Sequence, residues 1–264
     1  MVKMAYYPML RQIHGLLEPA TYVEIGVRNG ESMALAEPSV VAVGIDPAVD
    51  IKFLIGKDTR LFDLTSDDFF ERHNLSAELG NKTVELAFLD GMHLFEFALR
   101  DFINVEKYCE ASSVILLHDC LPIDAESAAR ERCTNVWSGD VWKLIMCLKK
   151  YRPDLRVDTI DVSPTGLGVI RNLNPQSTVL IDQYDVIEKE FIAQSHDVLS
   201  ADKSASLNVV ADPLDSVESL AAFFNVSSAV TAKVIELERQ RAQWFYSTVY
   251  NVKQMVRRWR DHYE

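Results

Sequence analysis

Four side chains, Asp90, His93, His118 and Asp119, have the types and the spacing that could do chemistry. The first two lie in "LAFLDGMHLFEFALRDF" (86–102) and the other two in "VILLHDC" (114–120), each pair at the end of an apolar run typical of a buried strand. Because the carboxyl ends of parallel strands meet at one edge of a sheet, we expect the four to lie together. Carboxylates and imidazoles so placed could bind a divalent cation, or an imidazole could take up a proton near neutral pH.

A second group surrounds a glycine turn in "YVEIGVRNGES" (22–32). Glu24 lies inside the apolar run, Gly26 and Gly30 follow four residues apart, and Ser32 comes directly after the turn. Backbone N–H groups at such a turn suit a carboxylate or a phosphate. The stretch is neither a GxGxxG dinucleotide fingerprint nor a P-loop. Taken alone, it fits equally well a strand–helix turn that uses glycine for geometry only.

Asp46 extends this second group. It ends the apolar run of "VAVGIDPA", roughly 20 residues after the glycine turn, where an acid accepts both hydroxyls of a ribose in nucleotide-binding α/β folds. The two features together predict a small ligand that contains a ribose and an anionic group.

Alternating short and long patterns predict the elements that must position these residues. Short β-branched runs between helical stretches are the signature of βαβ units on a parallel sheet, and the turn residues 163–165 predict an antiparallel hairpin. We therefore predict an α/β fold with a seven-stranded, mostly parallel sheet and a closing hairpin. The expected strands are 22–27, 40–45, 52–55, 84–90, 113–118, 156–162 and 166–172, and the expected helices lie around 31–36, 66–72, 96–106 and 141–150.

These residues resemble a known family. The pattern E-x-G-x-x-x-G at Glu24, Gly26 and Gly30, followed by Asp46, resembles the class I S-adenosylmethionine-dependent methyltransferases, which have a Rossmann-like fold. The stretches 86–102 and 114–120 resemble the branch of small-molecule and sugar O-methyltransferases of the macrocin type (methyltransferase domain 24). The resemblance covers about residues 20–172. It departs from the family at "CEASSVI", where many relatives have a Gly-Gly turn.

The resemblance implies S-adenosylmethionine as the cofactor. The residues that would bind its methionine portion are Glu24, Gly26, Gly30 and Ser32. Asp46 would bind the ribose, the segment 56–59 with Asp58 would pass the adenine, and Asp90 would border the same ligand.

It also implies a catalytic group at the predicted cluster. Asp90, His118 and Asp119 match the positions that hold a divalent metal in metal-dependent relatives, and a histidine among them favours a softer ion than Mg²⁺. Without a metal, His93 or His118 would be the general base, with Asp90 beside them. A purely structural interpretation makes Asp90 a helix cap and His118 a backbone hydrogen-bond donor.

The expected activity is methyl transfer to a hydroxyl of a small molecule or a sugar. Two alternatives stay open. The scaffold and its metal positions also resemble cephalosporin-hydroxylase-like oxygenases, in which histidine and carboxylate would bind iron. The chain could instead be a non-catalytic assembly protein.

Composition restricts partners and location. The net charge of −12 argues against nucleic acid as the main ligand, because nucleic-acid binding leaves a basic footprint. The four cysteines form no CxxC pair, which indicates reduced thiols in a cytoplasmic protein. Since no run approaches the roughly 18 apolar residues of a membrane span, we expect neither export nor a membrane anchor.

The character of the chain changes after Pro175. We expect a methyltransferase domain over 1–175 and a helical extension over 176–264 that serves oligomerisation or acts as a lid. Near its end, apolar residues alternate spacings of four and three, which predicts a seam that packs on the chain's own domain or on a second subunit. These residues are Phe245, Val249, Val252, Val256, Trp259 and Tyr263. The stretch 137–142, with Trp137 and Trp142, would be an acceptor wall or simple packing.

Overall fold

Seven strands form one sheet in the order β3-β2-β1-β4-β5-β7-β6. The computed structural model describes residues 5–263, with side chains described through residue 245 and at residue 248. The strands are β1 (Thr21–Ile25), β2 (Val41–Ile45), β3 (Thr59–Phe62), β4 (Val84–Leu89), β5 (Cys109–His118), β6 (Arg156–Ile160) and β7 (Leu167–Arg171). The pairings among β1 to β5 are parallel, and β7 runs antiparallel to both β5 and β6. The predicted Rossmann-like α/β fold with a closing hairpin is confirmed.

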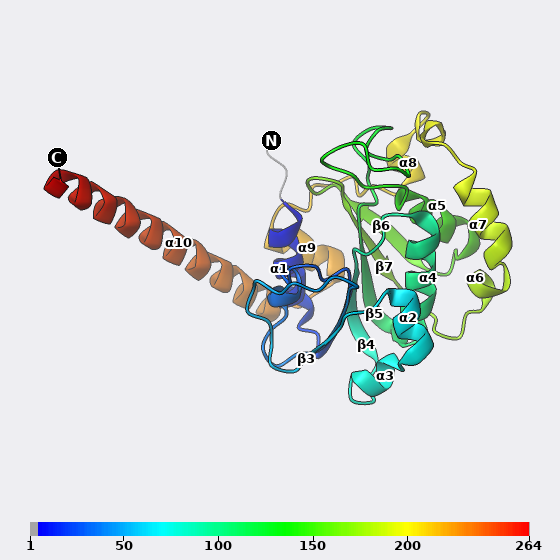
Figure 1. The fold of residues 1–264 in the computed structure, drawn as a ribbon, viewed down its shortest axis with the longest axis horizontal. Helices are drawn as coiled ribbons and strands as arrows, with labels where there is room; N and C mark the ends of the chain where they lie inside the picture. Colours follow the sequence, from blue (N-terminus) through cyan, green and yellow to red (C-terminus); the bar gives the residue numbers. More distant parts are fainter. Residues whose placement is uncertain (1–4, 264) are drawn as a thin grey trace. The chain divides into compact units, whose positions relative to one another are not determined.

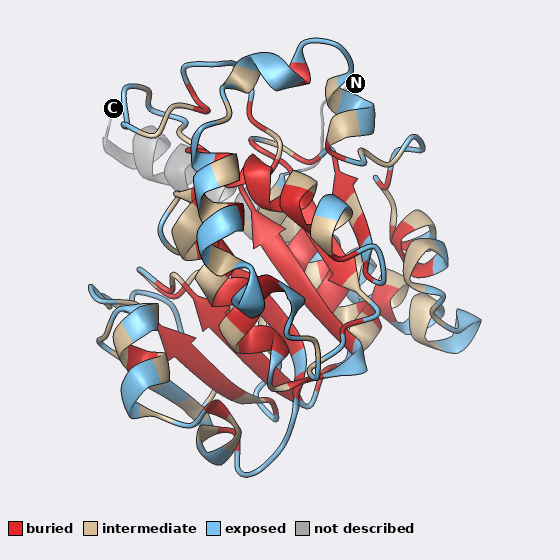
Figure 2. Ribbon diagram, turned by 90° about the vertical axis from the view of Figure 1, so that its right-hand side faces the viewer, coloured by how far each residue is buried: buried red, intermediate tan, exposed pale blue. Residues whose placement is uncertain are grey.

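The central strands are buried because helices cover them. Every residue of β1 is buried, as are four of the five residues in β2. Helices α4 (Phe95–Glu106) and α5 (Trp142–Tyr151) lie with α2 (Ser66–Arg72) and α7 (Tyr184–Ile192) on one side of the sheet, and α1 (Tyr6–Leu17) begins on the other (Figure 1). Figure 2 shows the buried strands as the centre of the molecule's core. The short helices are α3 (Leu75–Glu78), α6 (Val179–Asp182), α8 (Lys203–Ser206) and the 3-10 turns at Met33–Leu35 and His196–Leu199.

The third strand differs from its prediction. The expected run 52–55 is a loop whose backbone bonds to the glycine turn, with Asp50 N donating to Arg28 O at 2.8 Å and Lys52 N to Asn29 O at 2.8 Å. Leu54 is 95% exposed, so its apolar character does not reflect burial in the sheet. The strand comes later, at Thr59–Phe62. Asp58 therefore precedes β3 and lies at the amino-terminal edge of the sheet, opposite the predicted site.

The expected helix at 31–36 also differs. Only a 3-10 turn forms, at Met33–Leu35, and Ala36 is already extended. Pro38 accounts for the early stop, because proline disfavours helical backbone in the residue before it and donates no hydrogen bond. Ser32 stands directly before this turn.

The chain divides into two compact units. The boundary between them lies after Pro213, later in the chain than the predicted boundary at Pro175. One comprises the chain to Pro213 except Gly15–Leu17, and the other comprises Gly15–Leu17 with Leu214–Glu264. Residues 176–213 stay with the first unit because α7 packs on α4 and α5, with the Phe191 and Phe95 rings 5.2 Å apart.

The second unit contains α9 (Val217–Phe224) packed against α10 (Ser228–Tyr263). Phe245, the first residue of the predicted seam, is 59% exposed. The other seam side chains, from Val249 to Tyr263, lie outside the described side chains. No helix in the described part of the chain has both the length and the apolar character needed to cross a membrane.

Candidate functional site

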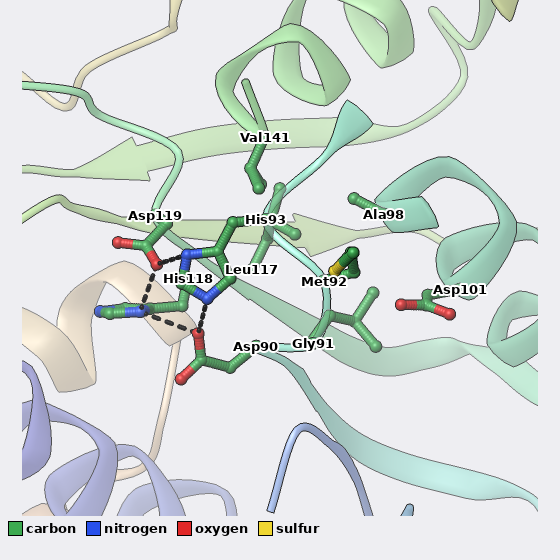
Figure 3. A pocket seen from close by; sticks show the side chains of 11 residues that line it. Asp90, Gly91, Met92, His93, Ala98, Asp101, Leu117, His118, Asp119 and Val141 are labelled. Atoms are coloured by element: carbon green, nitrogen blue, oxygen red, sulfur yellow. Dashed lines mark hydrogen bonds and ion pairs between the residues drawn. The ribbon is translucent and has the colours of Figure 1, made fainter. Parts of the chain in front are cut away.

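The carboxyl ends of β4 and β5 bring the four predicted residues together. Asp90 follows β4, His93 lies in the loop before α4, and His118 ends β5 with Asp119 directly after it. His118 Nδ1 is 3.1 Å from Asp90 Oδ1 and 3.4 Å from Asp119 Oδ2. His93 Nδ1 is 3.0 Å from Asp119 Oδ2, and its Nε2 is 3.7 Å from Asp90 Oδ1 (Figure 3). The four residues lie together as expected from the sequence, and each carboxylate is shared by both imidazoles.

These contacts set the charges of the cluster. Burial opposes a charged His118, but the Asp90 charge and the hydrogen bonds that both carboxylates accept from the ring raise the pKa of His118 to about 10. Burial likewise disfavours the protonated form of His93, yet the hydrogen bond and charge of Asp119 raise the pKa of His93 above its ordinary value. Although burial favours the neutral acid, the two histidines hold the pKa of Asp119 below its usual range. At neutral pH His118 therefore favours the protonated form, which cannot act as a general base, and His93 holds its proton more strongly than an ordinary imidazole does.

The two histidines differ in what they can offer a ligand. His118 is 7% exposed and lies between the rings of Tyr6, at 4.2 Å, and Phe88, at 6.0 Å. Its Nε2 is buried and has no hydrogen-bond partner among the described residues. Only Nδ1 reaches the carboxylates, so His118 is placed to orient Asp90 and Asp119.

A cation would fit a different set from the predicted one. Asp90, His93 and Asp119 each offer a ligand atom within 4.8 Å of the other two. The sequence pointed to Asp90, His118 and Asp119, because His118 adjoins Asp119 in the chain. The geometry groups His93 with the two acids, whereas His118 Nδ1 already lies 3.1 and 3.4 Å from their oxygens and is placed to hold them by hydrogen bonds. The ligand set with His118 stays a prediction.

The backbone at Asp119 supports a functional interpretation. Asp119 has φ 58°, a left-handed conformation that a side chain seldom adopts without a compensating role. Thr165, in the turn between β6 and β7, donates a hydrogen bond to Asp119 Oδ1. The hairpin thus fixes one carboxylate oxygen and leaves the other facing the histidines.

Trp137 and Tyr6 join the site from distant parts of the chain. The Trp137 ring stacks on His93 with centroids 5.2 Å apart and planes 9° from parallel, and His93 Nδ1 lies 3.1 Å from Trp137 O. Trp142, by contrast, is 1% exposed and packs in the core. Sequence reasoning missed Tyr6, and the only signal for it is the aromatic pair in "AYYP" at the start of α1.

The loop that carries Trp137 is fixed by charge. Arg130 donates to Glu96 Oε1 at 2.6 Å and to Asp140 Oδ2 at 2.7 Å, and Asp140 Oδ1 accepts the N–H of Phe95 at 2.7 Å. At Gly139 a Cβ atom would collide with the carbonyl oxygen of His93. The loop therefore contacts the His93 backbone closely enough to require glycine.

The protein's own packing explains why glycine is needed at both positions of the glycine turn. Gly26 has φ 94°, and a Cβ atom there would collide with the backbone of Asp90. Gly30 has φ 83°, and its Cβ would lie 2.8 Å from Ile51 Cδ1. These requirements hold without a ligand, so cofactor binding at this turn stays a prediction.

Asp46 and Glu24, the two acids predicted to bind S-adenosylmethionine, have different environments. Asp46 follows β2, its Oδ2 accepting the N–H of Arg28 at 2.8 Å and its Oδ1 that of Ala48 at 2.7 Å. Glu24 is 0% exposed and accepts hydrogen bonds from Ser32 Oγ at 2.5 Å and Tyr22 OH at 2.7 Å. Burial raises the pKa of Glu24 to about 8, against the effect of both hydroxyls. The predicted adenine residue Asp58 is not at this edge, and the residue that follows β3 is Asp63.

Comparisons with known proteins agree with this arrangement. Residues 23–120 match the family model described as a methyltransferase domain. The search of curated proteins finds no match.

Several solved structures are similar at low identity. The O-methyltransferase TomG from Streptomyces achromogenes, in complex with SAM, is 14% identical over 64% of this chain and 80% of its own, with a TM-score of 0.48. The cofactor-bound protein Rv0187 from MTB is 13% identical over 65% and 81%, with a TM-score of 0.49. An O-methyltransferase from Bacillus cereus in complex with SAH is 11% identical over 62% and 79%, with a TM-score of 0.43.

The family match carries the assignment. The matched segment begins in β1 and ends directly after Asp119, so it takes in the glycine turn, Asp46 and all four residues of the cluster. The predicted resemblance to methyltransferases is confirmed, because residues 23–120 match the model of a methyltransferase domain.

Proposed function

We propose that the protein is an S-adenosylmethionine-dependent O-methyltransferase that acts on a hydroxyl of a small molecule, with sugars among the candidates. The observation that carries the proposal is the cluster of two carboxylates and two imidazoles at the strand edge of a methyltransferase domain. Methyl transfer from a sulfonium to an alcohol needs a group that lowers the pKa of the hydroxyl or accepts its proton. The cluster offers ligands for a cation that would lower this pKa, and His93 would accept the proton only after losing its own.

The donor would bind over β1 and β2. Among the described residues, each carboxylate oxygen of Asp46 accepts a single hydrogen bond, from Arg28 N or Ala48 N, and so keeps capacity for a ribose hydroxyl. The Gly26–Ser32 turn would border the methionine portion. Asp63 replaces Asp58 as the acid nearest the end of β3.

A divalent cation fits Asp90, His93 and Asp119. Two carboxylates with one imidazole nitrogen suit a transition-metal ion better than Mg²⁺, which prefers oxygen ligands throughout. A cation bound there would lower the pKa of the acceptor hydroxyl. The chain's own residues supply the rest: His118 orients both carboxylates, and Trp137 holds the His93 ring. If no cation binds, His93 remains the candidate base, after losing the proton that Asp119 stabilises.

The alternatives are less favoured. The family match is to a methyltransferase domain, and it covers the glycine turn and Asp46, which neither an oxygenase nor an assembly role requires.

Donor binding tests the proposal. S-adenosylmethionine should bind the purified chain in calorimetry, and a methylated product should appear in mass spectrometry when an acceptor is found. Asp46→Ala should weaken donor binding about tenfold, because it removes the acceptor of the ribose hydrogen bonds. Asp58→Ala is the matched control, since this exposed acid lies at the opposite edge of the sheet and should leave the affinity unchanged. Equal losses in the two variants would contradict the donor site.

The second unit would make a homo-oligomer. The predicted seam along α10 starts at the exposed Phe245, and a second copy of the chain would cover it. Deleting residues 229–264 should reduce the mass seen in light scattering, and a soluble truncation with the parent's oligomeric state would contradict this role. We expect a cytoplasmic location, which the four free cysteines support.

A further inference from the structure

Glu24 is a buried acid with no cationic partner. It has 0% exposure, and within the described part of the chain its carboxyl accepts hydrogen bonds only from the hydroxyls of Ser32 and Tyr22. Within the described residues, no lysine, arginine or histidine forms an ion pair with it. A hydroxyl stabilises a carboxylate less than a cation does, so the neutral acid is favoured.

The groups that face Glu24 increase this preference. Asp90 from β4 and Asp46 from β2 add negative charge around it, and both raise its pKa. From α1, Tyr7 is a phenol whose pKa is raised chiefly by burial, so it brings no positive charge. His14, also on α1, packs on Tyr22 at 4.6 Å, and burial lowers its pKa to about 4, so it brings no positive charge.

A cation that binds at this edge of the sheet would favour the ionised form of Glu24 over the neutral one. S-adenosylmethionine carries a sulfonium and an ammonium against one carboxylate, so its net charge is positive, whereas the demethylated product has a neutral sulfur. Glu24 need not touch the donor, since Coulomb interactions act over several ångströms in a site of low dielectric. A positive charge near three acids favours ionisation of the one that is still neutral.

Resting on the proposed function, we propose that Glu24 is a specificity-determining residue that ionises when the cationic donor binds and takes a proton back once the sulfur is neutral. On binding, the O–H bond of the Glu24 carboxyl breaks and its proton goes to solvent. In methyl transfer the S–CH₃ bond breaks, the acceptor forms an O–CH₃ bond, and the hydroxyl proton leaves through the cluster. Glu24 then regains a proton from solvent. The product is thereby held less tightly than the donor.

Calorimetry in two buffers with different heats of ionisation tests this directly, because the difference in measured heat counts the protons released. At pH 7 the full chain should release about one proton more than Glu24→Gln when S-adenosylmethionine binds. With S-adenosylhomocysteine the excess over Glu24→Gln should be clearly smaller. Between pH 6 and 8 the parent's affinity for the donor should rise with pH, by up to about tenfold per unit, more steeply than that of Glu24→Gln. The variant baseline removes titration of the ligand's own amino group.

A second variant guards against misfolding of Glu24→Gln. Tyr22→Phe keeps Glu24 but removes a hydrogen bond that favours its carboxylate, so proton release should persist to higher pH than in the parent. Equal proton release by the parent and Glu24→Gln, or equal excess release with both ligands, would overturn the inference. If neither ligand binds the parent chain, the proposed function itself fails, which is a separate outcome.

Discussion

Glu24 and Asp119 are both buried carboxyls at the same edge of the sheet, yet their pKa values shift in opposite directions. Glu24, in the donor half formed by β1 and β2, is bonded to two hydroxyls, and burial raises its pKa to about 8. Asp119, in the cluster half formed by β4 and β5, faces two imidazoles that hold its pKa low despite burial. The partner of a buried acid, rather than its burial, decides whether it carries charge. The Glu24 carboxyl can therefore change its ionisation when a charged ligand approaches, whereas the Asp119 carboxylate stays negatively charged.

Gly26→Ala should have the largest effect, because Gly26 lies where β1 of the donor half meets the Asp90 backbone of the cluster half. The added Cβ collides with backbone, and φ 94° is unfavourable for any side chain. We expect a loss of unfolding free energy of about 3 kcal/mol or more, measured by denaturant titration.

Gly80→Ala is its control. Gly80 also has a left-handed φ of 72°, but nothing lies within 4 Å of its Cβ position, so only backbone strain of about 1 kcal/mol should appear. Similar losses in the two variants would show that strain, rather than contact between the halves, dominates at Gly26.

In the cluster half, Asp119→Ala should weaken Mn²⁺ or Co²⁺ binding by about 100-fold or more, since it removes a ligand and leaves two imidazoles without their shared acceptor. His118→Gln should weaken it by only about tenfold, because His118 orients the carboxylates without binding the ion. Calorimetry with the metal alone measures both. A loss at His118→Gln as large as at His93→Ala would restore His118 to the ligand set.

In the donor half, the stability of the parent relative to Glu24→Gln should depend on pH. The folded-state pKa of Glu24 is raised, so its contribution is fully present below the unfolded pKa near 4.5 and is lost as pH rises toward about 8. The parent should lose up to about 1.4 kcal/mol of stability per pH unit in this window relative to the variant. Thermal melts at pH 5, 6.5 and 8 measure it. A difference between the two proteins that does not change with pH would mean that Glu24 is ionised throughout.

The sheet and the meeting of the cluster could be predicted from sequence because they depend on local patterns. Buried strands consist of continuous apolar runs, and parallel topology brings the residues that follow such runs to one edge of the sheet. That rule is enough to place Asp90 beside His118, although 28 residues separate them.

What failed depended on information that a single run does not contain. The segment 52–55 is apolar but exposed, so the predicted third strand was wrong and Asp58 was assigned to the wrong edge. The roles of His93 and His118 depend on which imidazole is covered, and the Tyr6 ring, from the first turn of α1, lies 4.2 Å from that of His118. Stacking between residues so far apart in the chain leaves no periodic signal.

The position of Tyr6 also bears on how the protein is prepared. Its backbone N–H bonds to Ser163 O at 3.1 Å, which fixes the first turn of α1 beside the hairpin that holds Asp119. An affinity tag or fusion partner joined ahead of α1 would therefore be attached to a helix whose first turn lies beside His118 and Asp119. Removing such a tag before binding assays therefore matters more for this protein than for one whose first helix starts far from the site.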